Sequence, residues 1–247
     1  MGERVDALRA ARRRAARRRR IVRVVAWVGM AGVLAGGLTA AALTLAGKGN
    51  RAAATATGPA SPATGPASPA LPATGPEGIA LEDGTPLAPA STSATGRTID
   101  GISCSASEQV AYHIHTHLAV YVNGSLRPIP AGVGLVSPVA EQTADGPFDS
   151  ATTCYYWLHV HSQDGIIHVE SPSQRKYTLG QFFALWQQPL TADQVGPARG
   201  PLTVFVNGRR YAGPPSEITL LPHEDIQIDV GTPTVAPQQV DWSKSQL

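Results

Sequence analysis

The stretch AYHIHTHLAVYV, residues 111–122, places three histidines at alternate positions in a run that is otherwise typical of a buried strand. Because side chains on a strand alternate between its two faces, His113, His115 and His117 share one face. The opposite face, which includes Leu118, is almost wholly apolar. A helix would instead scatter the three rings at about 100° per residue. The stretch therefore predicts a strand with one core face and one imidazole face.

A second histidine-rich stretch, YYWLHVHSQDGIIHVE at residues 155–170, alternates in the same way. We expect its Asp-Gly pair at 164–165 to form a two-residue hairpin turn. In that register the facing pairs are His161 with His168 and His159 with Glu170. A three-residue loop would turn His168 away from the other rings, whereas a four-residue loop would keep the shared face.

The two histidine-rich segments together suggest a metal site. Imidazole nitrogens bind zinc and other first-row metals at about 2.0–2.1 Å, and open sites often have three protein ligands. The outer Cα atoms of one H-x-H-x-H strand lie about 13 Å apart, so a single ion cannot bind all three of its rings. We therefore expect the two segments to meet, with a preferred site built from His115, His117, His159, His161 and His168. The complete set of candidate metal ligands is His113, His115, His117, His159, His161, His168 and Glu170.

Glu170 is expected to be a metal ligand, a partner that orients an imidazole, or a general base. His223 lies in an expected turn and is either a further ligand or an exposed turn residue. The only methionines, Met1 and Met30, lie outside the domain, which argues against a Cu(I) site with thioether ligands. Zn²⁺ or Cu²⁺ fits the histidine set best. Iron or manganese fits if Glu170 is a ligand. The alternatives to metal binding are a pH-responsive imidazole cluster and a purely structural role.

The N-terminal residues have the pattern of a membrane anchor. Residues 1–23 contain ten arginines, and the 24 residues of 24–47 include no charged side chain. As a helix this segment would be about 36 Å long, enough to cross a hydrocarbon core of about 30 Å. The positive-inside bias then predicts a single-pass protein with residues 1–23 in the cytoplasm and the C-terminal domain outside the membrane. A cleaved signal peptide is the alternative, although its apolar region would be shorter.

Residues 48–97 are rich in Pro, Ala, Gly and Thr, and ATGPASP occurs twice in succession between residues 56 and 69. Such a segment cannot bury enough apolar surface to offset the entropy of ordering, so we expect a disordered linker. The folded domain is then 98–247. From Arg97 onward eight basic residues stand against thirteen acidic ones, a net charge of −5, which gives no support for binding nucleic acid. The sequence does not indicate a protein partner.

Turn signals divide the domain into short segments with alternating apolar residues, which predicts a mainly β fold of the α+β class. We expect an antiparallel sandwich or a partly open barrel. Asn-Gly pairs at 123–124 and 207–208 predict two-residue hairpins. The expected strands are 110–122, 125–129, 155–161, 166–170, 202–206, 209–212, 217–221 and 225–230.

One covering helix is expected between Thr178 and Pro189. Thr178 and Gln181 have the spacing of a capping box, and Pro189 would end the helix. The apolar residues at helical spacing are Leu179, Phe182, Phe183 and Trp186. A stripe at this spacing indicates a face that packs on the core.

The two cysteines, Cys104 and Cys154, lie in the part of the chain expected outside the membrane. An oxidising compartment lets a disulfide persist there, and closing a loop of about 50 residues would stabilise the fold by roughly 4 kcal/mol. The alternative is a pair of thiolate metal ligands, but the cysteines lack a C-x-x-C spacing. We therefore predict a disulfide.

These features predict a membrane-anchored extracytoplasmic domain that holds or delivers Zn²⁺ or Cu²⁺. One alternative is a metal-dependent hydrolase or oxidase in which Glu170 is the acid/base, and the sequence leaves open whether the protein is an enzyme. Another is a stalked cell-surface interaction domain without a metal. The sequence contains neither a G-x-S-x-G elbow nor a phosphate-binding glycine loop.

Overall fold

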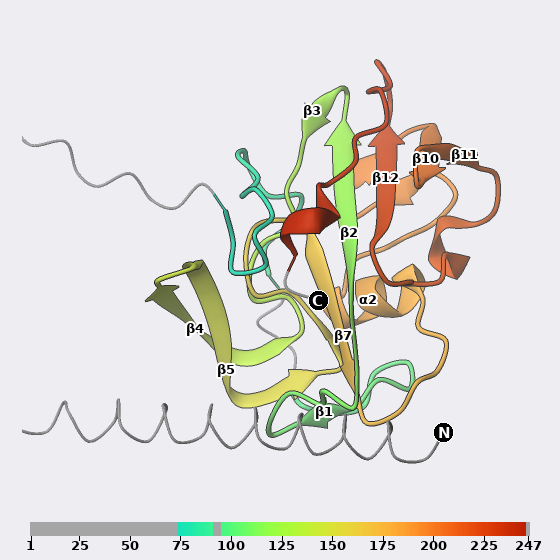
Figure 1. The fold of residues 1–247 in the computed structure, drawn as a ribbon. Coiled ribbons are helices and arrows are strands. Elements are labelled where there is room, and N and C mark those ends of the chain that lie inside the picture. The colour runs from blue at the N-terminus through green and yellow to red at the C-terminus, as the bar shows by residue number, and fades with distance from the viewer. Residues whose placement is uncertain (1–73, 91–94, 246–247) are drawn as a thin grey trace, which may run out of the picture. The chain divides into compact units, whose positions relative to one another are not determined.

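The computed structural model describes residues 74–90 and 95–245 (Figure 1). The predicted basic segment 1–23 and the predicted transmembrane segment 24–47 lie outside these ranges. Within the described ranges, no helix has the length and apolar character needed to cross a bilayer.

The histidine strand is at the centre of a seven-stranded sheet. The strands follow the order β11-β10-β12-β2-β7-β6, and the short β3 also pairs with β2. Their bounds are β2 Tyr112–Val122, β3 Ser125–Leu126, β6 Leu158–His159, β7 Ile166–Ser171, β10 Leu202–Val206, β11 Arg209–Tyr211 and β12 Glu224–Val230. The mainly β fold with one α-helix is confirmed for the described residues. The expectation of a wholly antiparallel sheet is wrong, because β12 pairs with β2 in parallel.

A second sheet has the order β1-β5-β4. It consists of β1 Cys104–Ser105, β4 Leu135–Thr143 and β5 Gly146–Tyr156, and a separate small pair is formed by β8 Gln194–Val195 and β9 Ala198–Arg199. The β4–β5 hairpin lies on the side of β2 and β7 opposite helix α2, Leu179–Trp186 (Figure 1). Neither large sheet closes on itself in the described residues, so the barrel alternative is not observed.

Both expected Asn-Gly turns are confirmed. Val122 pairs with Ser125 across the first turn, and Val206 pairs with Arg209 across the second. The central residues all have positive φ, between 51° and 77°, as a type I′ turn requires. These turns fix the register of the strands that they join.

Helix α2 begins after Thr178, as expected. Thr178 and Gln181 form both hydrogen bonds of the capping box, and the C-cap residue Gln187 adopts the left-handed conformation. The buried residues of the helix are Leu179, Phe182, Phe183, Leu185 and Trp186. The expected strand 217–221 is not formed. Its first residue, Glu217, ends the 3-10 helix η1, Pro215–Glu217, and a second such helix, η2, covers Trp242–Lys244.

The two faces of β2 separate as its alternation predicts. Ile114, Leu118 and Val120 belong to the main hydrophobic core, together with the apolar residues of α2. The histidines point to the other face. Because the core lies behind the sheet and the β4–β5 hairpin lies in front of it, both faces of the strand are covered.

Residues 74–90, which the sequence assigned to the linker, pack on the domain. Ile79 and Leu87 are buried, and the indole N–H of Trp186 donates a hydrogen bond to the Pro89 carbonyl at 2.8 Å. The backbone of Glu82 also hydrogen-bonds to the Gln163 carbonyl. The few apolar side chains in this Pro-rich segment are therefore sufficient to dock it, and the domain begins before residue 98.

The predicted disulfide between Cys104 and Cys154 is confirmed, with the two Cα atoms 5.6 Å apart. It joins β1 to β5 at the point where Cys104 pairs with Tyr156. Tyr156 is fully buried, and its hydroxyl donates a hydrogen bond to the Arg97 carbonyl at 2.6 Å. The disulfide thus links two strands of the second sheet that also pair by hydrogen bonds. Because both sulfur atoms are in this bond, the cysteines are not metal ligands.

Candidate metal centre

Three neighbouring strands bring histidines side by side. His168 on β7 pairs directly with His115 on β2 and with His159 on β6. Two residues further along β7, Glu170 pairs with His113. Because residues two apart on a strand share a face, these five side chains point to the same side of the sheet. The expected meeting of the two histidine-rich segments is therefore observed.

The hairpin register differs from the expected one by two residues. His159, rather than His161, lies opposite His168, because the chain leaves the sheet after β6. His161 instead accepts a backbone hydrogen bond from Asp149 on β5 through its carbonyl. An offset of two preserves the face on which a side chain points, so the imidazoles still meet.

The Nε2 atoms of His159 and His161 face each other. The Nδ1 atom of His159 lies 2.7 Å from the Tyr156 carbonyl oxygen, and that of His161 lies 2.7 Å from the Asp149 carbonyl oxygen. A carbonyl oxygen only accepts, so both Nδ1 atoms are the protonated donors. In the neutral rings both Nε2 atoms then carry lone pairs, yet they are 3.0 Å apart. Two acceptors at this distance require a cation between them.

Burial opposes a proton as that cation. It lowers the pKa of His161 to about 3, and it also lowers the pKa of His159, so both rings are neutral near pH 7. Burial likewise lowers the pKa of His115 to about 3 and that of His168 well below its usual value. Four of the imidazoles are thus in the deprotonated form that binds a metal.

The remaining ring contacts continue the cluster across the sheet. His115 Nε2 is 3.1 Å from both His113 Nε2 and His168 Nδ1. His113 is the most open of these rings, with 23% of its side chain exposed. Its hydrogen bond and charge interaction with Glu170 outweigh burial and raise its pKa. The cluster therefore opens towards solvent at His113.

Glu170 is the acidic centre of the cluster, with a side chain only 3% exposed. Burial would raise its pKa, but hydrogen bonds from His113 and His168 outweigh that effect and lower it below the usual range. Its Oε2 atom is buried without a hydrogen-bond partner. A buried carboxylate oxygen of this kind costs free energy unless a cation or donor satisfies it.

Two aromatic side chains of β5 cover the imidazoles on the side away from the core. Phe148 stacks on His161 with ring centroids 4.0 Å apart, and Tyr155 contacts His159 edge-on at 5.7 Å. The β4–β5 hairpin, whose strand β4 the sequence did not predict, thereby contacts the rings from one side. Metal-binding histidines are oriented by a partner of their other ring nitrogen, and the Tyr156 and Asp149 carbonyls are such partners here.

Two of the seven histidines lie apart from the cluster. His117, part of the expected site, has its Nε2 atom 3.2 Å from Glu82 Oε1 and lines a separate pocket of 260 Å³. His223 stacks on Trp242 with ring centroids 4.8 Å apart. His117 lies opposite Ile166 on β7, beyond the last imidazole of that strand, which explains why it does not reach the others.

Two carboxylates at the cluster were not predicted. Glu77 Oε2 lies 3.5 Å from His115 Nδ1, and Glu108 Oε1 lies 3.6 Å from His161 Nε2. Glu77 comes from the docked segment 74–90, and burial raises its pKa. No periodicity or spacing marks either residue in the sequence. Their role depends on how loops pack over the finished sheet.

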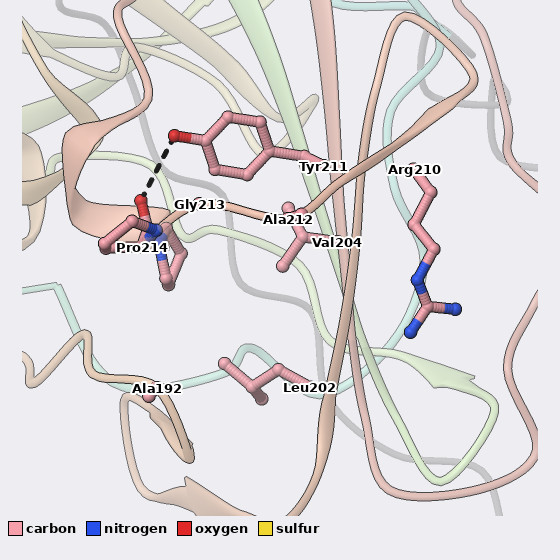
Figure 2. A pocket seen from close by; sticks show the side chains of 9 residues that line it. Ala192, Leu202, Val204, Arg210, Tyr211, Ala212, Gly213 and Pro214 are labelled. Carbon is pink, nitrogen blue, oxygen red and sulfur yellow. Dashed lines mark hydrogen bonds between the residues drawn. The ribbon is translucent and has the colours of Figure 1, made fainter.

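A larger pocket of 470 Å³ lies elsewhere and contains none of the histidines. Figure 2 shows Leu202, Val204 and Arg210 along its wall, with the Tyr211 hydroxyl 3.5 Å from the Pro214 carbonyl oxygen. Arg210 is its only charged lining residue. The titratable groups that could perform chemistry are thus concentrated in the histidine cluster and not in this pocket.

Two groups of potential ligand atoms, each within 4.8 Å of one another, occur in the described residues. One consists of His159, His161, His168 and Glu170, and the other of His113, His115 and His168. Protein-family models, curated proteins and solved structures were all compared with the chain, and none gave a match. The geometry alone therefore supports the functional argument, and it defines a buried His/Glu cluster able to hold a metal ion.

Proposed function

We propose that this protein is a metal-binding module that holds or delivers Zn²⁺ or Cu²⁺ outside the membrane. The observation that carries the proposal is the contact between His159 and His161. Ligands that are both 2.0–2.1 Å from one ion and 3.0 Å apart subtend an angle of about 95° at the ion, which a coordination sphere accommodates. A bound metal would supply the cation that the two lone pairs need.

Zn²⁺ and Cu²⁺ are the preferred ions for two reasons. Imidazole is a good ligand for both, and the disulfide leaves no free thiolate for a softer ion. Neutral imidazoles and one ionised carboxylate, Glu170, also require little loss of protons on binding. Iron or manganese stays a lower-ranked choice because only one carboxylate lies within the ligand groups.

The location outside the membrane is part of this proposal. Support comes from the arginine-rich segment 1–23 beside the apolar segment 24–47, and from the disulfide, which is typical of oxidising compartments. Protease added to intact cells should digest the domain and leave a short membrane-associated fragment. A domain that is degraded only after lysis would contradict the location without affecting the metal site.

Metal content of the purified full-length chain tests the function. After loading with Zn²⁺ or Cu²⁺ and removal of excess ion, elemental analysis should find bound metal in the wild type. His161→Ala and His159→Ala are expected to weaken binding of the ion between these two rings at least tenfold, since each removes one of its ligands. His223→Asn is the control, because asparagine tolerates the positive φ of this turn position and His223 is outside both ligand groups. Absence of metal in the wild type would overturn the proposal.

The rival function is a metal-dependent hydrolase or oxidase with Glu170 as acid/base. The opening at His113 favours it, because a metal-bound water needs access. The burial of His159, His168 and Glu170 favours holding the ion instead, since these side chains are shielded from solvent. Glu170→Gln separates the two functions. Retention of metal with loss of turnover of a substrate would support the enzyme, and weaker metal binding would support the metal-holding module.

A further inference from the structure

The two oxygens of the Glu170 carboxylate face different imidazoles. Oε1 lies 2.9 Å from His113 Nε2 and 3.5 Å from His168 Nδ1. Oε2 lies 4.0 Å from His159 Nε2 and is the buried oxygen without a hydrogen-bond partner. One carboxylate therefore divides the cluster into an Oε1 side and an Oε2 side.

The three imidazoles on the Oε1 side have the spacing of ligands in one coordination sphere. The nitrogens of His113, His115 and His168 follow one another at 3.1 Å, and His113 Nε2 is 2.9 Å from Oε1. Ligands bound at 2.0–2.1 Å are about 2.9 Å apart in an octahedron and about 3.4 Å apart in a tetrahedron. Three imidazoles can thus hold one ion, whereas Glu170 is outside this group of ligand atoms.

The Oε2 side offers two imidazoles, His159 and His161, with their Nε2 atoms 3.0 Å apart. Together with Oε2 of Glu170 they form a set of two histidines and one carboxylate. Such a set leaves coordination positions open for water or another small ligand. The unpartnered Oε2 is the atom that such an ion would satisfy.

One ion cannot serve both sides in this arrangement. The most distant ligands of a single sphere are about 4.2 Å apart, so all its atoms would fall within 4.8 Å of one another. The imidazoles instead divide into two groups at that limit, which have only His168 in common. His113 and His115 do not join the group that contains His159 and His161.

We infer that the cluster binds two metal ions per chain, one in each group of ligand atoms. This inference rests on the proposed function. The first ion is held by His113, His115 and His168 Nδ1, and the second by His159, His161 and Glu170. Ions in two-metal sites are about 3.5–4 Å apart.

The distribution of negative charge fits two divalent ions. Each side has its own additional carboxylate within 4 Å of a ring nitrogen: Glu77 beside His115 and Glu108 beside His161. With Glu170 between them, three carboxylates face the two sides. This partly offsets the repulsion of two dications at close distance.

The experiment is a metal count on the full-length chain loaded with Cu²⁺ and freed of excess ion, combined with electron paramagnetic resonance. The wild type should hold two ions per chain, and their proximity should reduce the resonance intensity below that of two isolated Cu²⁺ ions. His113→Ala and His161→Ala should each hold one ion and recover the full intensity expected for one. His223→Asn should retain two coupled ions.

The outcomes separate this inference from the proposed function. A wild type with one ion, lost in both His113→Ala and His161→Ala, would overturn the two-ion inference and leave the metal-binding function intact. Two ions without magnetic coupling would overturn the placement of both ions in this one cluster. A wild type without bound metal would overturn both proposals, whatever the folding of the variants.

Discussion

His115 and His168 pair directly across β2 and β7, and their facing nitrogens lie 3.1 Å apart. This pairing joins residues 53 positions apart in the sequence. Neutral imidazoles in such contact can alternate as donor and acceptor or share a cation. Metal binding should therefore be strongly linked to the folded state.

We expect added metal to stabilise the protein. At a free Zn²⁺ concentration of 100 times Kd, the free energy of unfolding should increase by about 2.7 kcal/mol for one site. For a domain of this size Tm should then rise by roughly 5–10 °C, measured by calorimetry on chelator-treated protein before and after loading. His168→Ala should lose most of this increase, because His168 belongs to both ligand groups. An equal increase in His168→Ala and wild type would contradict the site.

The low pKa of His161 predicts a pH dependence of the metal-free protein. Its folded pKa is about 3, against 6.5 for the free side chain, so the unfolded state binds more protons between these values. Stability should fall as pH decreases from 6.5, by up to about 1.4 kcal/mol per pH unit from this residue. His161→Gln should show a shallower fall in urea unfolding at pH 7, 6 and 5. Parallel profiles would count against the buried neutral ring.

Asp164 predicts a dependence of opposite sign. It is buried, and burial raises its pKa to about 8 from 3.8. The folded state therefore retains a proton that the unfolded state releases, and stability falls as pH rises from 3.8 to 8. Asp164→Asn keeps an oxygen for the Ile166 N–H and cannot ionise. At pH 8 this variant should be more stable than wild type by at least about 1.4 kcal/mol. A less stable variant at pH 8 would show that the ionised carboxylate is favourable there.

Removal of residues 74–97 should destabilise the domain. Ile79 and Leu87 are buried, and each contributes roughly 1.5–3 kcal/mol to folding. A chain that starts at residue 98 should unfold at lower urea concentration than one that starts at residue 74, and it should also lose Glu77 from the histidine cluster. The chain from residue 74 is the matched control, because it keeps these contacts. Equal unfolding midpoints would mean that the segment does not contribute to the core.

Local signals in the sequence predicted the parts of the fold that depend on neighbouring residues. The alternation of His113, His115 and Leu118 defined β2, and the capping residue Thr178 marked the start of α2. The β4–β5 hairpin was missed because most side chains of β4 are exposed, most of those of β5 are half-buried, and Pro138 interrupts β4. Without that hairpin, the covering of the imidazoles could not be anticipated.

The candidate site was predicted in its residue types more fully than in its geometry. Alternation placed the histidines on one face, but whether His113 or His117 joins the others depends on where β7 ends relative to β2. The parallel pairing of β12 with β2 links segments more than 100 residues apart, which no local pattern specifies. Glu77 was missed because it lies in a Pro-rich segment whose docking depends on the finished core.

The alternation of β2 also protects its own alignment. A slip of β2 by one residue against β7 would turn the imidazoles into the hydrophobic core of the domain. It would also bring Leu118 and Val120 to the face of the sheet that carries the polar side chains. Both exchanges are unfavourable, and an ion that requires nitrogens at defined spacing would oppose the slip further. Metal binding would then stabilise the correct register of β2 against β7 relative to the shifted one while the protein folds.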